Sequence, residues 1–222
     1  MTEVQQRNEE DIYNSIKQAI LQHKLRPNTR LIEKELAKQF KVSRTPIRNV
    51  LRRLAYEKLI KIIPNKGAIV ICPSIEESKQ ILQIREVLEA AAIRQVCRNI
   101  TEEQIEEIKS VIEEEQAANA KGDLFESLDL SLGFHYKIAE LTGNQYYYRY
   151  LEELISLVYV IVSFYGSRQV FSGWQDHFKL LDLIKERKEE EAERFMAEHL
   201  REVAEGIFFE EDFSISLGDV FK

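Results

Sequence analysis

The hydrophobic period of the sequence changes twice, and this change most restricts the folds open to the chain. Before residue 59 apolar residues recur at helical spacing, and two short β-branched runs follow at 59–63 and 68–71. Pro64-Asn65-Lys66-Gly67 separates them and has the composition of a hairpin turn. From Pro73 onward the helical period returns, and no further strand pattern is found before the tail. The chain is therefore expected to be mainly α-helical, with one small hairpin.

The first part of the chain is predicted to be a winged helix-turn-helix. Short helices are expected at about 12–21 and 32–40, with a third beginning after Ser43. Ser43 is a favourable N-cap because its hydroxyl can accept a hydrogen bond from a first-turn amide, and Pro46 is tolerated in that turn. In this fold the third helix enters the major groove, and the hairpin lies against the backbone or the minor groove.

The remainder is predicted to be an antiparallel bundle of six to seven helices. Ser74-Ile-Glu-Glu77 and Thr101-Glu-Glu-Gln104 fit the capping box, so helices should begin near 75 and 102. Further helices are expected at about 123–141, 145–166, 174–187 and 189–209. Short connections between them favour antiparallel packing.

Charge is distributed unevenly along the chain. The formal net charge is −7, but residues 1–73 carry 15 Lys and Arg against 7 Asp and Glu, whereas residues 74–222 carry 16 against 31. A basic segment suits a polyanionic partner, and an acidic segment of this size indicates a different task. We therefore expect a domain over 1–73 that meets a polyanion such as DNA and a separate acidic domain over 74–222.

Composition excludes several other classes of protein. With 44% hydrophobic and 31% charged residues, the chain has the makeup of a folded globular protein. Cys72 and Cys97 form no CxxC pair, which argues against a disulfide framework or a thiolate zinc site. The polar N-terminus lacks the features of a signal peptide, and the most apolar run, 154–165, is shorter than the roughly 20 residues of a membrane span. A cytoplasmic protein without membrane contacts is expected.

Arginines on the third predicted helix are the main DNA-binding signal. Arg44, Arg48 and Arg52 lie four residues apart on one face. Arg44 and Arg48 are the natural candidates to contact guanine O6 and N7. Phosphate and groove positioning suit Arg30, Ser43, Thr45 and Lys66. A solvated basic face is the alternative, but amides and the helix dipole at the start of this helix also favour phosphate.

These segments resemble the winged-helix signature of the GntR transcription regulators. The resemblance is carried by Leu31-Ile32-Glu33-Lys34-Glu35-Leu36-Ala37, by the run from Val42 to Leu54, and by Pro64-Asn65-Lys66-Gly67-Ala68-Ile69-Val70. It implies operator binding as a homodimer through Arg30, Ser43, Arg44, Thr45, Arg48, Lys66 and Gly67. Asn28 and Lys58 stand where the family usually has Gly; Asn tolerates a left-handed backbone, whereas Lys does so less well.

Three of the four histidines lie on separate predicted helices of the second domain. His135, His177 and His199 each share a helix face with apolar residues, so each is expected to point into the bundle. Hydrogen-bonded core histidines are one interpretation. The other is a divalent cation bound by three neutral imidazoles, since no charge partners for them are expected. Periodicity alone leaves both open.

The second domain resembles the all-helical FCD effector domain of many GntR regulators in the FadR subfamily. The resemblance spans roughly 78–205 and is carried by Leu128 to His135, by Leu141-Thr142-Gly143-Asn144, and by the spacing of His177 and His199. In metal-binding members an Asp one helical turn before the first histidine completes the ligand set. That position here is Ser131, and Asp129 lies about 240° away around the helix, so it cannot substitute.

The FCD resemblance implies a metal held by His135, His177 and His199, with an effector near Arg85, Ser131 and Asn144. Zinc or nickel is expected because imidazole prefers borderline metals. Without the Asp the ion would keep its double charge and an open position for a carboxylate effector. Loss of the metal, with the histidines binding an anion directly, is the alternative. Arg85 can instead pair with Glu89 at i+4, and a helix-capping role is favoured for Asn144.

Together with these patterns, the two resemblances imply a dimeric, ligand-responsive transcription regulator and not an enzyme, with a DNA-binding domain over 1–73 and an effector-binding and dimerisation domain over 74–222. A small organic acid in the helical domain would change the spacing of two winged helices and hence their affinity for operator DNA. The alternatives are a metal-free acyl-thioester sensor, a helical metalloenzyme, for which no carboxylate is found at a spacing suited to a general base, and an architectural DNA binder without an effector. No role is predicted for the acidic, aromatic tail at 208–222.

Overall fold

The described residues fold into two compact units, one before Pro73 and the other from residue 73 to residue 207. The structure, a computed structural model, describes residues 8–21, 24–64, 66–71, 73–165 and 173–207. Cys72 and the tail at 208–222, both considered above, lie outside the described residues. Within the described ranges, no helix combines the length and the apolar character that crossing a membrane requires.

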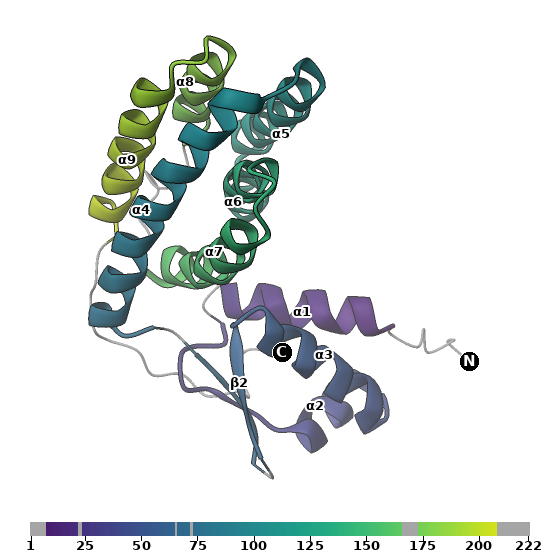
Figure 1. Ribbon diagram of the computed structural model, residues 1–222. Coiled ribbons are helices and arrows are strands. Elements are labelled where there is room, and N and C mark those ends of the chain that lie inside the picture. The colour runs from purple at the N-terminus through teal and green to yellow at the C-terminus, as the bar shows by residue number, and fades with distance from the viewer. Residues whose placement is uncertain (1–7, 22–23, 65, 72, 166–172, 208–222) are drawn as a thin grey trace. The chain divides into compact units, whose positions relative to one another are not determined.

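The first unit is the predicted winged helix-turn-helix (Figure 1). Its elements are α1 (Glu9–Leu21), β1 (Arg30–Leu31), α2 (Glu33–Phe40), α3 (Arg44–Tyr56), β2 (Ile60–Ile63) and β3 (Gly67–Val70). The strands form an antiparallel sheet in the order β1-β3-β2. The pairing of β1 with β3 was not predicted, because a strand of two residues is too short to show a period of its own.

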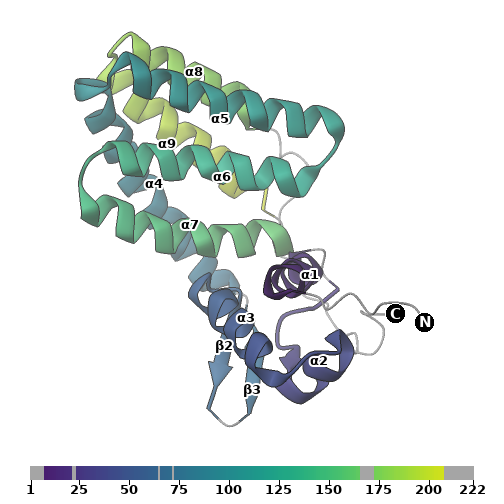
Figure 2. The ribbon, with the colours of Figure 1, turned by 90° about the vertical axis from the view of Figure 1, so that its right-hand side faces the viewer.

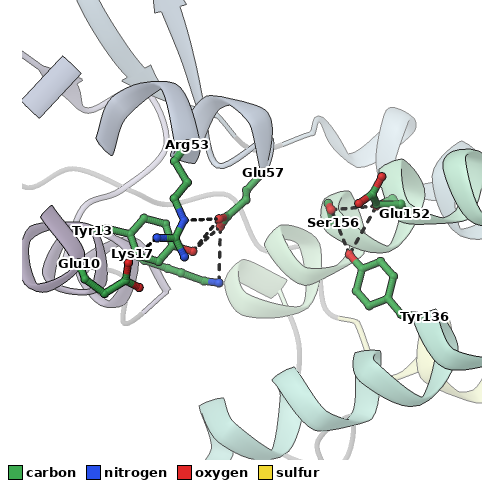
Figure 3. Close-up of polar contacts among 8 residues, drawn as sticks. All are labelled: Glu10, Tyr13, Lys17, Arg53, Glu57, Tyr136, Glu152 and Ser156. Carbon is green, nitrogen blue, oxygen red and sulfur yellow. Dashed lines mark hydrogen bonds and ion pairs between the residues drawn. The ribbon is translucent and has the colours of Figure 1, made fainter. Parts of the chain in front are cut away.

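Polar contacts fix α1 to the end of α3 (Figure 3). The Tyr13 hydroxyl donates to the carboxylate of Glu57 at 2.6 Å, and the Arg53 guanidinium lies 3.5 Å from the centre of the Tyr13 ring. Beneath these contacts, Ile12 and Ile16 of α1 are fully buried. The recognition helix α3 is therefore held by a helix outside the helix-turn-helix pair.

Two loop residues of the first unit adopt the left-handed backbone conformation that the resemblance implied. Asn28 has φ 65° and Lys58 has φ 59°. Asparagine enters this region more easily than lysine, which has no short polar side chain to hydrogen-bond locally. The turn after α3 is therefore built on a less suitable residue than glycine.

The second unit contains the six predicted helices within its described residues, with bounds close to those expected. They are α4 (Ile75–Asn99), α5 (Glu102–Lys121), α6 (Leu124–Leu141), α7 (Gln145–Tyr165), α8 (Trp174–Lys185) and α9 (Glu189–Glu205). Both capping boxes form, Ser74 with Glu77 and Thr101 with Gln104. These reciprocal hydrogen bonds fix the two helix starts where the sequence placed them.

The helices of the second unit form two crossing layers. Figure 2 shows α5, α6 and α7 running side by side, with α8 next to α5, while α4 and α9 pair in the layer behind them. Across the α6 and α7 pair, the Tyr136 hydroxyl lies 3.0 Å from the Ser156 hydroxyl (Figure 3). The three histidines lie on α6, α8 and α9, and so converge from both layers on the core.

Candidate functional site

The first candidate site is a cleft between α3 and the hairpin. It encloses about 440 Å³. Its lining residues are Ile32, Glu33, Lys34, Arg44, Arg48, Ile62, Ile63, Pro64, Lys66 and Gly67. The structure thus brings four of the predicted DNA-binding residues together. The other three, Arg30, Ser43 and Thr45, are exposed but do not line this cleft.

Ser43 occupies the N-cap position of α3, but its side chain makes no capping hydrogen bond. The expectation that its hydroxyl accepts a first-turn amide is therefore wrong. The hydroxyl is exposed at the helix start. There the amides and the hydroxyl are both available to an anion.

Arg48 is held in place by an acidic neighbour from α2. Its Nε donates to both carboxylate oxygens of Glu33, at 3.1 and 2.9 Å. About half of the Arg48 side chain is exposed, so the pair adds little stability. Its main effect is to orient the guanidinium along the wall of the cleft.

Gly67 has a backbone role at the start of β3. Its φ is +90°, and a Cβ at this position would lie 2.6 Å from the carbonyl oxygen of Leu31. A side chain there would clash with β1 and would also hold an unfavourable backbone conformation. Glycine is therefore required for β1 and the hairpin to approach each other.

The second candidate site is the histidine cluster, formed by His135, His177 and His199. Their exposed fractions are 2%, 0% and 4%, and one ring nitrogen from each lies within 4.8 Å of the others. The rings of His135 and His199 are stacked at 5.6 Å between centroids, and that of His177 meets each of them edge to face. The structure therefore brings together all three residues predicted as metal ligands.

Each imidazole of the histidine cluster has a carboxylate at Nδ1. Nδ1 of His177 lies 2.7 Å from Oε2 of Glu115 on α5, and Nδ1 of His135 lies 2.5 Å from Oε2 of Glu89 on α4. Nδ1 of His199 lies 3.3 Å from Oδ2 of Asp176 on α8. A carboxylate at Nδ1 favours the tautomer that leaves Nε2 as the metal-binding atom.

Burial sets the protonation of two members of the histidine cluster, His135 and His177. It lowers the pKa of His135 to about 3 and that of His177 well below its usual value, so both imidazoles are neutral. Burial alone would raise the pKa of Glu89, but Arg85 and His135 outweigh it and hold that pKa at about 2. For Glu115, burial raises the pKa to about 8 against an opposing hydrogen bond from Ser131. Neutral imidazoles are the form that binds a metal ion.

The donor set of the histidine cluster fits a borderline divalent metal. Three imidazole nitrogens suit zinc or nickel, and Nε2 of His177 is buried without a hydrogen-bond partner among the described residues. Gly173 lies beside the cluster, and a Cβ there would come within 3.3 Å of Cε1 of His199. The backbone thus approaches the imidazoles at a position where a side chain would crowd them.

The residues predicted near an effector occupy three different environments. Arg85 is buried and forms an ion pair with Glu89, as the alternative interpretation held. Asn144 accepts the amide of Tyr146 at 2.9 Å, which caps the start of α7. Ser131 is half-buried and interacts with the Glu115 carboxyl at the histidine cluster. Arg85 is thus held in an ion pair and Asn144 in a helix cap. Ser131 is the one of the three that contacts a carboxyl group of the histidine cluster without either constraint among the described residues.

The expectation that the histidines lack charge partners is wrong. Glu89, Glu115 and Asp176 supply them, and spacing along one helix could not show these pairs because each carboxylate lies on a different helix from its histidine. One signal was present in the sequence. Glu115 continues the apolar face of Ile105, Ile108 and Ile112 at spacings of three and four, which predicts a buried carboxylate.

Comparison with known proteins assigns both units. Residues 80–202 match the FCD domain, and residues 8–70 match the gntR family of bacterial regulatory proteins. The HTH-type transcriptional repressor RspR of Escherichia coli K12 is 26% identical over 89% of this chain and 88% of its own length. The Nta operon transcriptional regulator of Aminobacter aminovorans is 29% identical over 79% of this chain and 83% of its own. Among solved structures, E. coli McbR/YncC has a TM-score of 0.71 at 22% identity, covering 89% of this chain and 95% of that one, and so shares the fold.

Proposed function

Because this chain belongs to the gntR family of bacterial regulatory proteins and carries an FCD domain, it is a transcription regulator and not an enzyme. We propose that it binds operator DNA as a homodimer and that a small organic acid controls this binding. The first unit reads the operator, and the second binds the acid. The two half-sites of an operator must match the spacing of the two winged helices in a dimer. A small reorientation within the dimer is therefore sufficient to change its affinity for DNA.

In this proposal some residues of the first unit contact bases and others contact phosphates. Arg44 and Arg48 contact guanine edges, and Glu33 keeps the Arg48 guanidinium oriented before DNA arrives. Phosphate contacts come from Arg30, Ser43, Thr45 and Lys66. Gly67 sets the path of the hairpin and contributes through its backbone.

The second unit would bind a divalent metal, zinc or nickel, through Nε2 of His135, His177 and His199. When bound, the ion supplies positive charge and an open coordination position that a carboxylate can fill. Ser131 would face the effector, whereas Arg85 acts through Glu89 and Asn144 acts through the cap of α7. A small mono- or dicarboxylate is the ligand class that this arrangement favours.

The observation that carries the metal and effector proposal is the convergence of three buried imidazoles, each with a carboxylate at Nδ1. Elemental analysis before and after a chelator, followed by zinc or nickel reconstitution, tests the metal. A thermal-shift screen of C2–C6 carboxylates on the reconstituted protein then tests the acid. Protein that takes up neither metal, or that no carboxylate stabilises, would contradict the corresponding part of the proposal.

Regulation is tested with DNA selected from a random duplex library. Fluorescence anisotropy should show the acid changing operator affinity by about 5- to 150-fold, the usual range for coupled sites. The same operator should change the affinity for the acid by the same factor. If the acid binds equally tightly with and without the operator, the two sites are not coupled.

A further inference from the structure

The Glu115 carboxyl group is the least expected member of the site. It is fully buried on α5, and no lysine or arginine pairs with it among the described residues. Glu89 has Arg85 as its cation, and Asp176 is partly exposed and pairs with Lys179. A buried carboxyl group without a cation costs free energy, so its presence calls for a compensating role.

The contacts of Glu115 point toward the histidine cluster. Oε2 lies 2.7 Å from Nδ1 of His177, whose Nε2 is buried and unpartnered on the other side of the ring. The Ser131 side chain hydrogen-bonds the same carboxyl group. Oε1 is also buried without a hydrogen-bond partner within the described part of the chain. The carboxyl group is thus directed at one imidazole and held by one hydroxyl.

From these contacts we propose that Glu115, held by Ser131, is the positioning residue that orients His177 and supplies the negative charge that α6 lacks at position 131. The inference rests on the proposed metal site and names the residues that complete it in this chain. The charge comes from α5 and acts through Nδ1 of His177, not through direct contact with an ion.

Charge balance around the cluster supports this role. Glu89 is paired with Arg85 and Asp176 with Lys179, which leaves Glu115 as the one carboxyl group at the cluster without a lysine or arginine partner among the described residues. A divalent cation held by Nε2 of His177 would favour the ionised form of this carboxyl group, because opposite charges attract strongly in or near the low-dielectric core.

The test compares Glu115→Gln with Glu114→Gln in the full-length protein. Gln keeps the length of Glu and can still accept from Nδ1, so this change removes the charge alone; Glu114 is the exposed neighbour and controls for net charge. Zinc affinity is measured by competition with a chromophoric chelator. We expect Glu115→Gln to weaken zinc binding by about 10- to 100-fold, the usual effect of a residue behind a ligand, and Glu114→Gln to leave it unchanged.

Urea unfolding in the presence of a chelator separates positioning from a structural role. Trp174, the single tryptophan, lies on α8, the helix that carries His177, and reports the unfolding of the second unit. For Glu115→Gln we expect the metal-free unfolding midpoint to stay at or above that of the unchanged protein. A lowered metal-free midpoint together with unchanged zinc affinity would overturn the proposal.

The role of Ser131 is tested by a double-mutant comparison. Ser131→Ala should weaken zinc binding less than Glu115→Gln does, and the double variant should lose no more than Glu115→Gln alone, because Ser131 acts through Glu115. Additive losses would refute that linkage. If the unchanged protein itself binds neither zinc nor nickel, the proposed metal site fails; if it binds zinc and Glu115→Gln binds it equally well, only this inference fails.

Discussion

Replacing Arg85 by Met should show whether this arginine stabilises the core of the second unit or binds the effector. Arg85 is 2% exposed and pairs with Glu89, which is fully buried and also contacts His135. Removal of one partner leaves an uncompensated charge in the core and costs about 3–5 kcal/mol. At a typical urea m-value of roughly 2 kcal/mol per molar, the unfolding midpoint would fall by about 1.5–2.5 M.

A second substitution should reverse most of this loss. Glu89→Gln in the Arg85→Met background removes the stranded charge, while the amide oxygen can still accept from Nδ1 of His135. We expect the double variant to recover more than half of the lost free energy of unfolding. Trp174 fluorescence during urea titration of chelator-treated protein measures this in the second unit.

Two outcomes would refute the reasoning about Arg85. If Arg85→Met unfolds at the same urea concentration as the unchanged protein, the pair does not stabilise the core. If the double variant is as unstable as Arg85→Met, the stranded Glu89 charge is not the cause. Unchanged stability together with loss of a carboxylate-induced thermal shift would instead make Arg85 a direct ligand of the effector.

Three further predictions concern the backbone and a thiol. Gly67→Ala should destabilise the hairpin by more than about 1 kcal/mol, because the new methyl group meets a carbonyl of β1; unchanged hydrogen-exchange protection of the β3 amides would contradict this. Lys58→Gly should raise the free energy of unfolding by about 0.5–1 kcal/mol, and with it the thermal midpoint, because glycine adopts the left-handed conformation more easily than lysine. The control Lys61→Gly in β2 should lower the midpoint. In a Cys72→Ser background Cys97 should resist iodoacetamide at pH 8 until urea unfolds the protein, because burial raises its pKa to about 11 and the reactive thiolate is scarce; labelling of folded protein at the unfolded rate would refute it.

Local patterns were sufficient to predict most of the fold. The capping boxes at Ser74 and Thr101 and the hairpin after α3 are encoded within a few residues, so their positions follow from the sequence. The inward direction of His135 likewise follows from the period of one helix. Such features depend on neighbours along the chain, which the sequence lists directly.

The partners of the histidines could not be predicted in the same way. Glu115 precedes His177 by 62 residues, and their contact depends on how α5 packs beside α8. The ion pair of Arg85 is a different case: its i+4 partner was visible, but its complete burial depends on the packing of α4 against other helices. Helix packing therefore decides which of two interpretations of a side chain holds.

The contacts between α1 and α3 hold α3 at one end, so a small tilt of the helix would move its other end. Tyr13 and Arg53 hold it near its C-terminal end, close to Glu57, while Arg44 lies at the opposite end. The span from residue 44 to residue 56 is about 18 Å at 1.5 Å per residue. A tilt of about 5° transmitted through α1 would displace the Arg44 end by roughly 1.5 Å, enough to break a hydrogen bond to a base. In the proposed mode of DNA recognition, base contacts by Arg44 would therefore depend on the position of α1, a helix that need not touch DNA.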